Sequence, residues 1–252
     1  MSNRDTAGRR ILMLGGTSEA RALAGTLTDA GYGLITSLAG RTAAPRSLPG
    51  NVRIGGFGGS TGLADYLRAN AIDLLVDATH PFAAQISANA VEAAREAGIP
   101  LLRLERPAWD RPSGANWVET GCIEDAADAL PKGALALLTV GRQELAPFAA
   151  RTDCRFVARM IDVPDRLPDD WVAIAARGPF TLEGELRLLT DYQITHLVTK
   201  NSGGAQVGAK LDAAAKLSIP MIVVARPHLP AAETLASVDD AYQAIIRVFR
   251  TD

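Results

Sequence analysis

Cysteine is scarce in this chain of 252 residues. Its two cysteines, Cys122 and Cys154, lie far apart and neither belongs to a Cys-x-x-Cys pair, which argues against a disulfide framework and a zinc site. The three histidines are also isolated, because no two of them show the spacing of metal ligands. We therefore expect no metal centre and a reducing environment.

Long apolar runs are missing as well. The first ten residues are polar and precede only four apolar ones, too few for a signal-peptide core or a membrane span. The formal net charge of -2 gives no positive field that would attract nucleic acid or an anionic membrane. These absences predict a soluble, cytoplasmic protein without a nucleic-acid or membrane partner.

Short apolar runs alternate with helix-like segments along the chain. In the first half the apolar runs are 11–14, 33–38, 51–54, 72–78 and 99–104, and the helical patterns are 19–30, 62–70 and 83–97. In the second half the apolar runs are 134–140, 154–160, 170–176, 194–200 and 219–225, and the helical patterns are 181–191, 205–217 and 238–250. Such alternation is typical of βα units with parallel strands. It predicts an α/β fold of two Rossmann-like domains with mainly parallel sheets and an interdomain cleft for the ligand.

The boundary between the two domains is expected within residues 105–117. This stretch mixes proline and glycine with polar residues and has neither helical nor strand periodicity. We place the junction near residue 112. The prediction is then a nucleotide-binding domain of residues 1–112 and a second domain of residues 113–252 that contributes the substrate pocket.

The turn after the first predicted strand reads Gly15-Gly16-Thr17-Ser18-Glu19-Ala20 and lacks the Gly-x-Gly-x-x-Gly spacing. Its glycines permit positive φ and close approach of a ligand, and the hydroxyls of Thr17 and Ser18 suit a helix cap or a phosphate. Glu19 favours the helix dipole but suits a pyrophosphate poorly unless it points aside. A turn without a ligand is the alternative, although the place after the first strand favours a dinucleotide phosphate.

The end of the second predicted strand has no acidic residue, which is the residue that selects a free ribose hydroxyl. Instead, Ser37, Gly40 and Arg41 follow one another closely, and a hydroxyl with a guanidinium suits a 2'-phosphate. The pattern favours NADPH over NADH. The alternative is that Arg41 is an ordinary surface arginine.

The fourth predicted strand ends in Asp77-Ala78-Thr79-His80-Pro81-Phe82, where a nicotinamide or substrate ring would lie. His80 is a candidate proton donor, because histidine titrates near neutral pH. Pro81 and Phe82 are candidates for a stacking wall. A structural or solvated histidine is the alternative for His80.

Three loops of the second half place Arg or Lys beside glycine after an apolar run. They contain Arg142, Arg177, and the segment Thr199-Lys200-Asn201-Ser202-Gly203-Gly204. Freed backbone N–H groups and cationic side chains make an anion pocket, so the predicted ligand bears several carboxylates. The chain has 22 arginines against 4 lysines, which reflects either genomic base composition or a need for bidentate contacts to such anions.

With these motifs the chain resembles the precorrin-6A reductase family of cobalamin biosynthesis, which includes the cobalt-precorrin-6A reductases. The matching segments are ILMLGGTSEAR at 11–21, DATHPFAAQIS at 77–87, LLRLERP at 101–107, TVGR at 139–142, RGPF at 177–180, TKNSGG at 199–204 and ARP at 225–227. They span nearly the whole chain in the expected order.

The resemblance implies an NADPH-dependent oxidoreductase that delivers hydride to C19 of precorrin-6A, reduces the C18=C19 double bond and gives precorrin-6B. The implied substrate is a macrocycle edged by acetate and propionate groups, which agrees with the predicted polyanion. Lys200 is the first candidate to stabilise electron density arriving in the ring and His80 is the second. The proton at C18 comes from one of these, from water or from a substrate carboxyl group.

The candidate residues fall into three groups. For the cofactor they are Gly15, Gly16, Thr17, Ser18, Glu19, Ala20, Ser37, Gly40, Arg41, Asp77, Ala78, Thr79, Pro81 and Phe82. For the substrate they are Arg142, Arg177, Ser202 and Gly203, and for catalysis Lys200 and His80.

Two other functions stay open at this point. One is another NAD(P)H-dependent reductase that resembles dihydrodipicolinate reductase, although residues 134–225 alternate with helices where that family has a largely antiparallel sheet. The other is a two-lobed sensor that binds a nucleotide or another anion without turnover. Neither the cobalt content of the substrate nor the oligomeric state follows from the sequence.

Overall fold

The computed structural model of the chain describes residues 8–40 and 48–250. It consists of two compact units. The first unit comprises Met1–Pro107 and Pro227–Asp252, and the second comprises Ala108–Arg226. Each unit has a six-stranded sheet whose strands are all parallel, as the alternation of apolar runs and helical patterns predicted.

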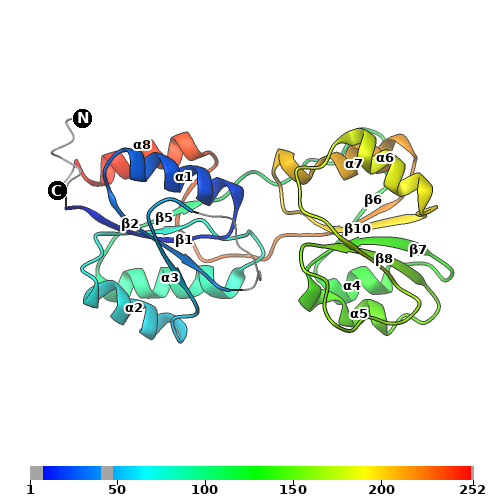
Figure 1. The fold of residues 1–252 in the computed structure, drawn as a ribbon, viewed down its shortest axis with the longest axis horizontal. Helices are drawn as coiled ribbons and strands as arrows, with labels where there is room; N and C mark the ends of the chain where they lie inside the picture. Colours follow the sequence, from blue (N-terminus) through cyan, green and yellow to red (C-terminus); the bar gives the residue numbers. More distant parts are fainter. Residues whose placement is uncertain (1–7, 41–47, 251–252) are drawn as a thin grey trace. The chain divides into compact units, whose positions relative to one another are not determined.

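The first sheet has the strand order β12-β5-β4-β1-β2-β3. Its strands are β1 (Arg10–Leu14), β2 (Gly33–Leu38), β3 (Asn51–Ile54), β4 (Leu74–Asp77), β5 (Leu101–Leu104) and β12 (Glu233–Leu235). Helices α1 (Ser18–Asp29) and α8 (Val238–Val248) cover one face, and α2 (Gly59–Ala69) and α3 (Ala84–Ala97) cover the other (Figure 1). The chain runs outward from β1 through β2 to β3, and from β4 through β5 in the opposite direction. The order therefore reverses between β1 and β4, the place where open α/β sheets bind ligands.

Alternation along β1 builds both cores of the first unit. Ile11 and Met13 face α1 and α8, whereas Leu12 and Leu14 face α2 and α3, and all four side chains are buried. A strand with both faces covered needs such a continuous apolar run. The run therefore places β1 at the centre of the sheet.

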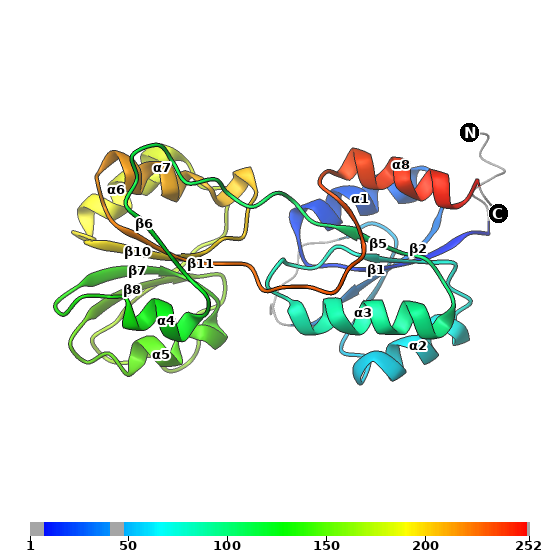
Figure 2. The same ribbon diagram turned by 180° about the vertical axis from the view of Figure 1, so that it is seen from behind.

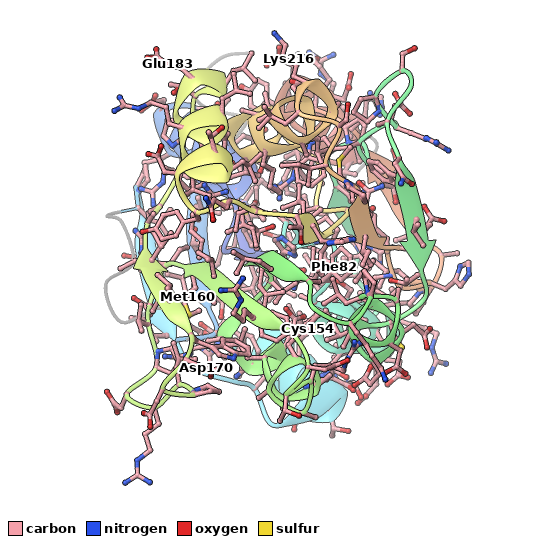
Figure 3. All side chains as sticks on the ribbon, turned by 90° about the vertical axis from the view of Figure 1, so that its right-hand side faces the viewer. Phe82, Cys154, Met160, Asp170, Glu183 and Lys216 are labelled. Atoms are coloured by element: carbon pink, nitrogen blue, oxygen red, sulfur yellow. The ribbon has the colours of Figure 1, made fainter. Side chains whose placement is uncertain are left out.

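The second sheet has the corresponding order β6-β11-β10-β7-β8-β9. Its strands are β6 (Trp117–Thr120), β7 (Leu135–Thr139), β8 (Arg155–Met160), β9 (Val172–Ala175), β10 (His196–Lys200) and β11 (Met221–Val224). Helices α4 (Ile123–Asp128) and α5 (Ala146–Ala149) lie on one face, and α6 (Leu182–Asp191) and α7 (Ala209–Lys216) on the other (Figure 2). Glu183 and Lys216 mark the outer side of the α6 and α7 layer (Figure 3). This sheet reverses its order between β7 and β10.

The C-terminal segment departs from the expected division of the chain. Residues 227–252 were expected in the second domain, but β12 pairs with β5 and α8 buries Ala241, Ala244 and Ile245 in the core of the first unit. The chain enters the second unit at Ala108, slightly before the expected residue 112. The strand β12 escaped sequence reasoning because it has three residues and no buried position.

Among the described residues, no helix is both long and apolar enough to cross a membrane. In the same part of the chain, no three His, Cys, Asp or Glu side chains gather as a metal site requires.

Candidate functional site

The turn after β1 packs closely against the sheet on one side and is open on the other. A Cβ on Gly15 would lie 3.0 Å from Cγ2 of Thr36, and the Gly15 N–H donates to the Ser37 carbonyl at 2.9 Å. Gly16 has a φ of 132°, and a Cβ there would meet nothing within 4 Å. The backbone at Gly16 therefore offers a ligand room for close approach. This space and the start of α1 fit a dinucleotide phosphate.

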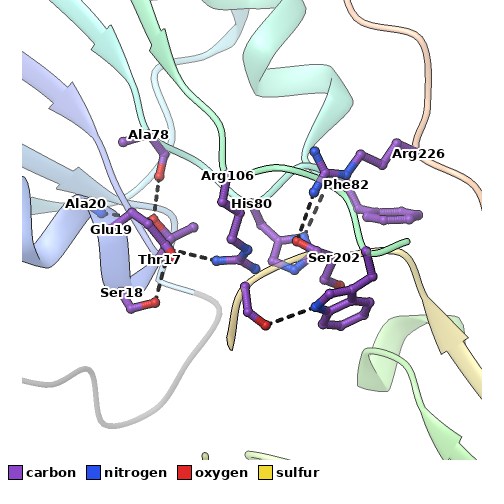
Figure 4. Close-up of polar contacts among 12 residues, drawn as sticks. Thr17, Ser18, Glu19, Ala20, Ala78, His80, Phe82, Arg106, Ser202 and Arg226 are labelled. Carbon is purple, nitrogen blue, oxygen red and sulfur yellow. Dashed lines mark hydrogen bonds and ion pairs between the residues drawn. The ribbon is translucent and has the colours of Figure 1, made fainter. Parts of the chain in front are cut away.

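Thr17 joins this turn to the loop after β4. Its Oγ1 accepts the Ala20 N–H at 3.0 Å, which caps α1, and its hydroxyl donates to the Ala78 carbonyl at 3.0 Å (Figure 4). Both functions of the hydroxyl are thus used within the protein. The side chain of Thr17 holds the loops after β1 and β4 together, and its backbone N–H is the group that it can offer to a ligand.

Glu19 points toward a cation within its own unit. Arg106, which follows β5, donates from Nη1 to Oε2 of Glu19 at 2.7 Å, and the Ser18 hydroxyl donates to the same oxygen at 3.0 Å (Figure 4). Burial raises the pKa of Glu19, but the charge of Arg106 and these hydrogen bonds outweigh it and hold the pKa below its usual value. The carboxylate is therefore charged and compensated at neutral pH.

Asp77 is a buried anchor of the loop that follows β4. Its side chain is 1% exposed and accepts the Thr79 hydroxyl at 2.7 Å and the Thr79 N–H at 3.2 Å. Arg103 donates from Nε to its other oxygen at 3.3 Å and from Nη1 to the Pro230 carbonyl at 3.0 Å. Asp77 therefore fixes the loop and links it to the returning C-terminal segment.

His80 is held within the same loop. The Phe82 N–H donates to Nδ1 of His80 at 3.3 Å, so a neutral ring carries its proton on Nε2. The rings of His80 and Phe82 lie 5.9 Å apart, and Pro81 is buried. A shallow hollow at this edge of the sheet is lined by Thr17, Glu19, Thr79, Pro81, Leu104, Glu105 and Arg106. It joins the loops after β1, β4 and β5.

The end of β2 carries a further contact that sequence reasoning missed. Ser37 is 5% exposed, and its Oγ accepts Nη1 of Arg53 at 2.9 Å. Gly40 is exposed with a φ of 71°. The predicted phosphate ligand Arg41 lies outside the described residues.

In the second unit, Lys200 at the end of β10 is paired with a carboxylate. Its Nζ donates to Oε1 of Glu144 at 2.8 Å, and Oε2 of Glu144 accepts the Gly141 N–H at 2.7 Å. Arg142, from the same loop as Glu144, is exposed, and so is Arg177. The structure thus joins the loops that follow β7 and β10, where the order of the second sheet reverses.

The segment that follows Lys200 is fixed by polar contacts at its base. Arg226 donates from Nε to the Asn201 carbonyl at 2.9 Å. It also donates from Nη2 to the Ser202 carbonyl at 3.2 Å (Figure 4). The Asn201 side chain bonds the backbone of Trp109, and Nε1 of Trp109 donates to the Gly204 carbonyl at 3.0 Å. Gly203, at a φ of 67°, provides the turn. These contacts therefore hold the backbone of the loop after β10 in one conformation before any ligand binds.

Comparison with known proteins agrees with this arrangement. The family model described as precorrin-6x reductase CbiJ/CobK matches residues 10–246. The chain belongs to this family. A precorrin-6A reductase of Rhodococcus erythropolis is 50% identical over 239 residues, which are 94% of this chain and 96% of that protein. One from Rhodobacter capsulatus is 45% identical over 234 residues, covering 91% and 93% of the two chains.

A solved structure has the same fold. It is described as CobK precorrin-6A reductase and matches with a TM-score of 0.91 and 43% identity, over 95% of this chain and 97% of that one. The resemblance found in the sequence is therefore confirmed. In a reductase family with Rossmann-like sheets, a nicotinamide cofactor supplies the hydride and the protein supplies binding and orientation. Its substrate, as the family description implies, is a small tetrapyrrole-derived molecule.

Two ion pairs add Arg106 and Glu144 to the residues that the sequence predicted for the site. Arg106 lies in the segment LLRLERP and Glu144 two residues beyond the segment TVGR, but no partner for either residue could be predicted from the sequence. Arg106 and Glu19 are 87 positions apart, and Lys200 and Glu144 are 56 apart. The strand order explains both contacts, because β10 lies beside β7 in the second sheet and only β4 separates β5 from β1 in the first.

Proposed function

We propose that this chain is a precorrin-6A reductase that uses NADPH to reduce the C18=C19 double bond and gives precorrin-6B. The observation that carries the proposal is the 50% identity to a precorrin-6A reductase across both units. The open phosphate cradle after β1 supports it independently. The overall change adds a hydride to C19 and a proton to C18, so NADPH and one proton are consumed for each NADP formed.

In this proposal the first unit binds the cofactor. The backbone N–H groups of the turn from Gly15 to Ala20 and the N-terminal end of α1 bind the pyrophosphate. Arg106 draws the Glu19 carboxylate aside and compensates its charge, which removes the repulsion that this residue would otherwise exert. The loop from Asp77 to Phe82 borders the nicotinamide. When bound, NADPH supplies the hydride.

The second unit binds the substrate in the proposal. Lys200 and Arg142, with Arg177 from a neighbouring loop, hold acetate and propionate groups, and the turn of Ser202 and Gly203 borders them. The Ser202 N–H itself donates to the Lys200 carbonyl at 2.7 Å and so sets the shape of this turn. Glu144 keeps the Lys200 ammonium oriented. A fixed cation stabilises electron density that arrives in a conjugated ring, which is the role we assign to Lys200. Water or a substrate carboxyl group supplies the proton at C18, with His80 as a second candidate.

The preference for NADPH rests on the end of β2. A carboxylate there would accept a hydrogen bond from a free 2'-hydroxyl, and the strand instead ends in Ser37 and Leu38. The alternative of a dihydrodipicolinate reductase-like enzyme loses support, because every strand pairing in the second sheet is parallel.

The test is a turnover assay with freshly prepared precorrin-6A. Loss of NADPH absorbance together with a new corrinoid spectrum is the expected result, and product analysis should place the hydrogen from the cofactor at C19. NADPH binding without turnover on fresh substrate would overturn the proposal in favour of a sensor. NADH consumed as efficiently as NADPH would overturn the cofactor preference alone.

A further inference from the structure

Arg53 occupies the carboxyl end of β3, directly beside Ser37 in the pairing of β2 with β3. Its guanidinium makes three hydrogen bonds. Nη1 donates to Oγ of Ser37 at 2.9 Å and to the Gly55 carbonyl at 2.8 Å, and Nη2 donates to the Gly56 carbonyl at 2.8 Å. One face of the group lies 3.8 Å from the centre of the Phe57 ring. Arg53 is therefore fixed in position before any ligand binds.

The fixed guanidinium retains unused donors. Arginine has five N–H donors, and the contacts of Arg53 within the described residues occupy three of them. Nε and one N–H of Nη2 remain. Arg53 is partly exposed, whereas Ser37 is 5% exposed. Between these neighbours, Arg53 is the one whose polar atoms can meet a ligand.

The charge of Arg53 is also uncompensated in the described part of the chain. Arg103, Arg106 and Arg159 pair with Asp77, Glu19 and Glu185 respectively. Arg53, in contrast, bonds only neutral oxygens among the described residues. A held cation that bonds carbonyl and hydroxyl oxygens keeps its attraction for an anion, and a planar guanidinium suits phosphate in particular.

Its place in the sheet indicates which anion it would meet. A dinucleotide bound where the order reverses, at β1 and β4, extends its adenosine half toward β2, whose end discriminates at the ribose 2' position. Leu14 pairs with Ser37, and Ser37 pairs with Arg53. Arg53 therefore lies one strand beyond β2 and two strands from β1, at the same edge of the sheet.

We propose that Arg53 is a specificity-determining residue that binds the phosphomonoester on the adenosine ribose, and that Ser37 is a positioning residue that orients it. This inference rests on the proposed nicotinamide cofactor. The sequence singled out Ser37 and Arg41 for this phosphate, and Arg41 lies outside the described residues. The inference adds Arg53, which the sequence did not single out, and makes Ser37 its positioning partner.

Direct binding tests the inference without turnover. The dissociation constants of NADPH, NADH and adenosine 2',5'-bisphosphate are measured by titration against the wild-type chain, Arg53→Gln, Arg53→Lys and Ser37→Ala. Arg53→Gln should weaken NADPH and the bisphosphate about 10- to 100-fold and leave NADH within about 3-fold, as the loss of a charged phosphate contact predicts. Arg53→Lys should retain part of the preference, and Ser37→Ala should lower the ratio of NADPH to NADH affinity by less.

Arg68→Gln is the matched control, because Arg68 lies on α2 in exposed pairs with Asp65 and Glu96. It should bind all three ligands as the wild type does. Equal weakening of NADPH and NADH by Arg53→Gln and Arg53→Lys would assign Arg53 to the fold and overturn the inference, as would unchanged NADPH binding. A wild-type chain that binds neither dinucleotide would instead overturn the proposed function.

Discussion

Arg106 contacts Glu19 at 2.7 Å and so links the loop after β5 to the first turn of α1. The pair is only partly exposed, with side-chain exposures of 13% and 24%. The positive charge of Arg106 compensates the negative charge of Glu19, which would otherwise disfavour a pyrophosphate bound nearby. The contact explains how a glutamate is accommodated in the turn that we propose binds the cofactor phosphates.

Arg106→Ala should weaken NADPH binding about 10-fold or more, because it leaves the Glu19 carboxylate uncompensated near the pyrophosphate. The double variant Glu19→Gln with Arg106→Ala should recover most of this loss, since it removes the repelling charge. Titration of NADPH against the wild type, the two single variants and the double variant measures the coupling free energy between Glu19 and Arg106. Additive effects of the two substitutions would mean that the pair does not act at the cofactor.

The same carboxylate predicts a pH dependence of stability. Because the pKa of Glu19 in the folded chain is below its usual value, its ion pair stabilises the fold fully above that usual value, and this contribution is lost as the pH falls through the lowered pKa. Glu19→Gln should therefore show a shallower loss of unfolding free energy on acidification. Urea denaturation at a series of pH values compares the two slopes, and identical slopes would contradict the prediction.

Lys200→Ala should lower kcat with precorrin-6A about 10- to 100-fold and change the NADPH dissociation constant by less than about 2-fold, because the loss falls on stabilisation of the reacting ring. Glu144→Gln should have a smaller effect, since it leaves the cation in place but loosens it. Lys216→Ala, at an exposed position near the end of α7, serves as the control in the same steady-state assay. An unchanged rate would remove Lys200 from the reaction.

Ile245→Ala should destabilise the chain by about 2 to 5 kcal/mol, because the side chain is fully buried where α8 meets the first sheet. Its neighbour Ile246 is partly exposed, so Ile246→Ala should cost clearly less. Thermal unfolding followed by circular dichroism separates the two. Equal losses would argue against the assignment of α8 to the core of the first unit.

Much of the fold follows from local patterns, because buried parallel strands are continuous apolar runs. The predicted segment 33–38 coincides with β2, 72–78 contains the fully buried β4, and 134–140 contains β7. The elements that escaped are short or exposed, such as α4 with six residues and β12 with three. They present too few positions for a period of 3.6 or 2 to emerge.

In the candidate site, too, the residues with local roles could be predicted from the sequence and those that depend on distant partners could not. Gly16 could be predicted from the sequence, because the freedom of a glycine to adopt positive φ in the turn after the first strand depends on that residue alone and on no distant partner. The partners of Glu19 and Lys200 could not, since they depend on which loops adjoin at the sheet edge. The contact of Ser37 could not be predicted either, because its hydroxyl accepts a hydrogen bond from Arg53 on the neighbouring strand β3.

The double passage of the chain between the units has a consequence for synthesis on the ribosome. The second unit is continuous, from Ala108 to Arg226, whereas the first needs segments from both sides of it. The apolar face that α8 covers, including Leu102 and Leu104 of β5, stays open to water until Val248 has left the exit tunnel. During that interval the nascent first unit exposes an apolar, aggregation-prone surface, so we expect it to need chaperone protection while the second unit is being synthesised. We also expect that the first unit can bind its cofactor only after synthesis of the chain is finished.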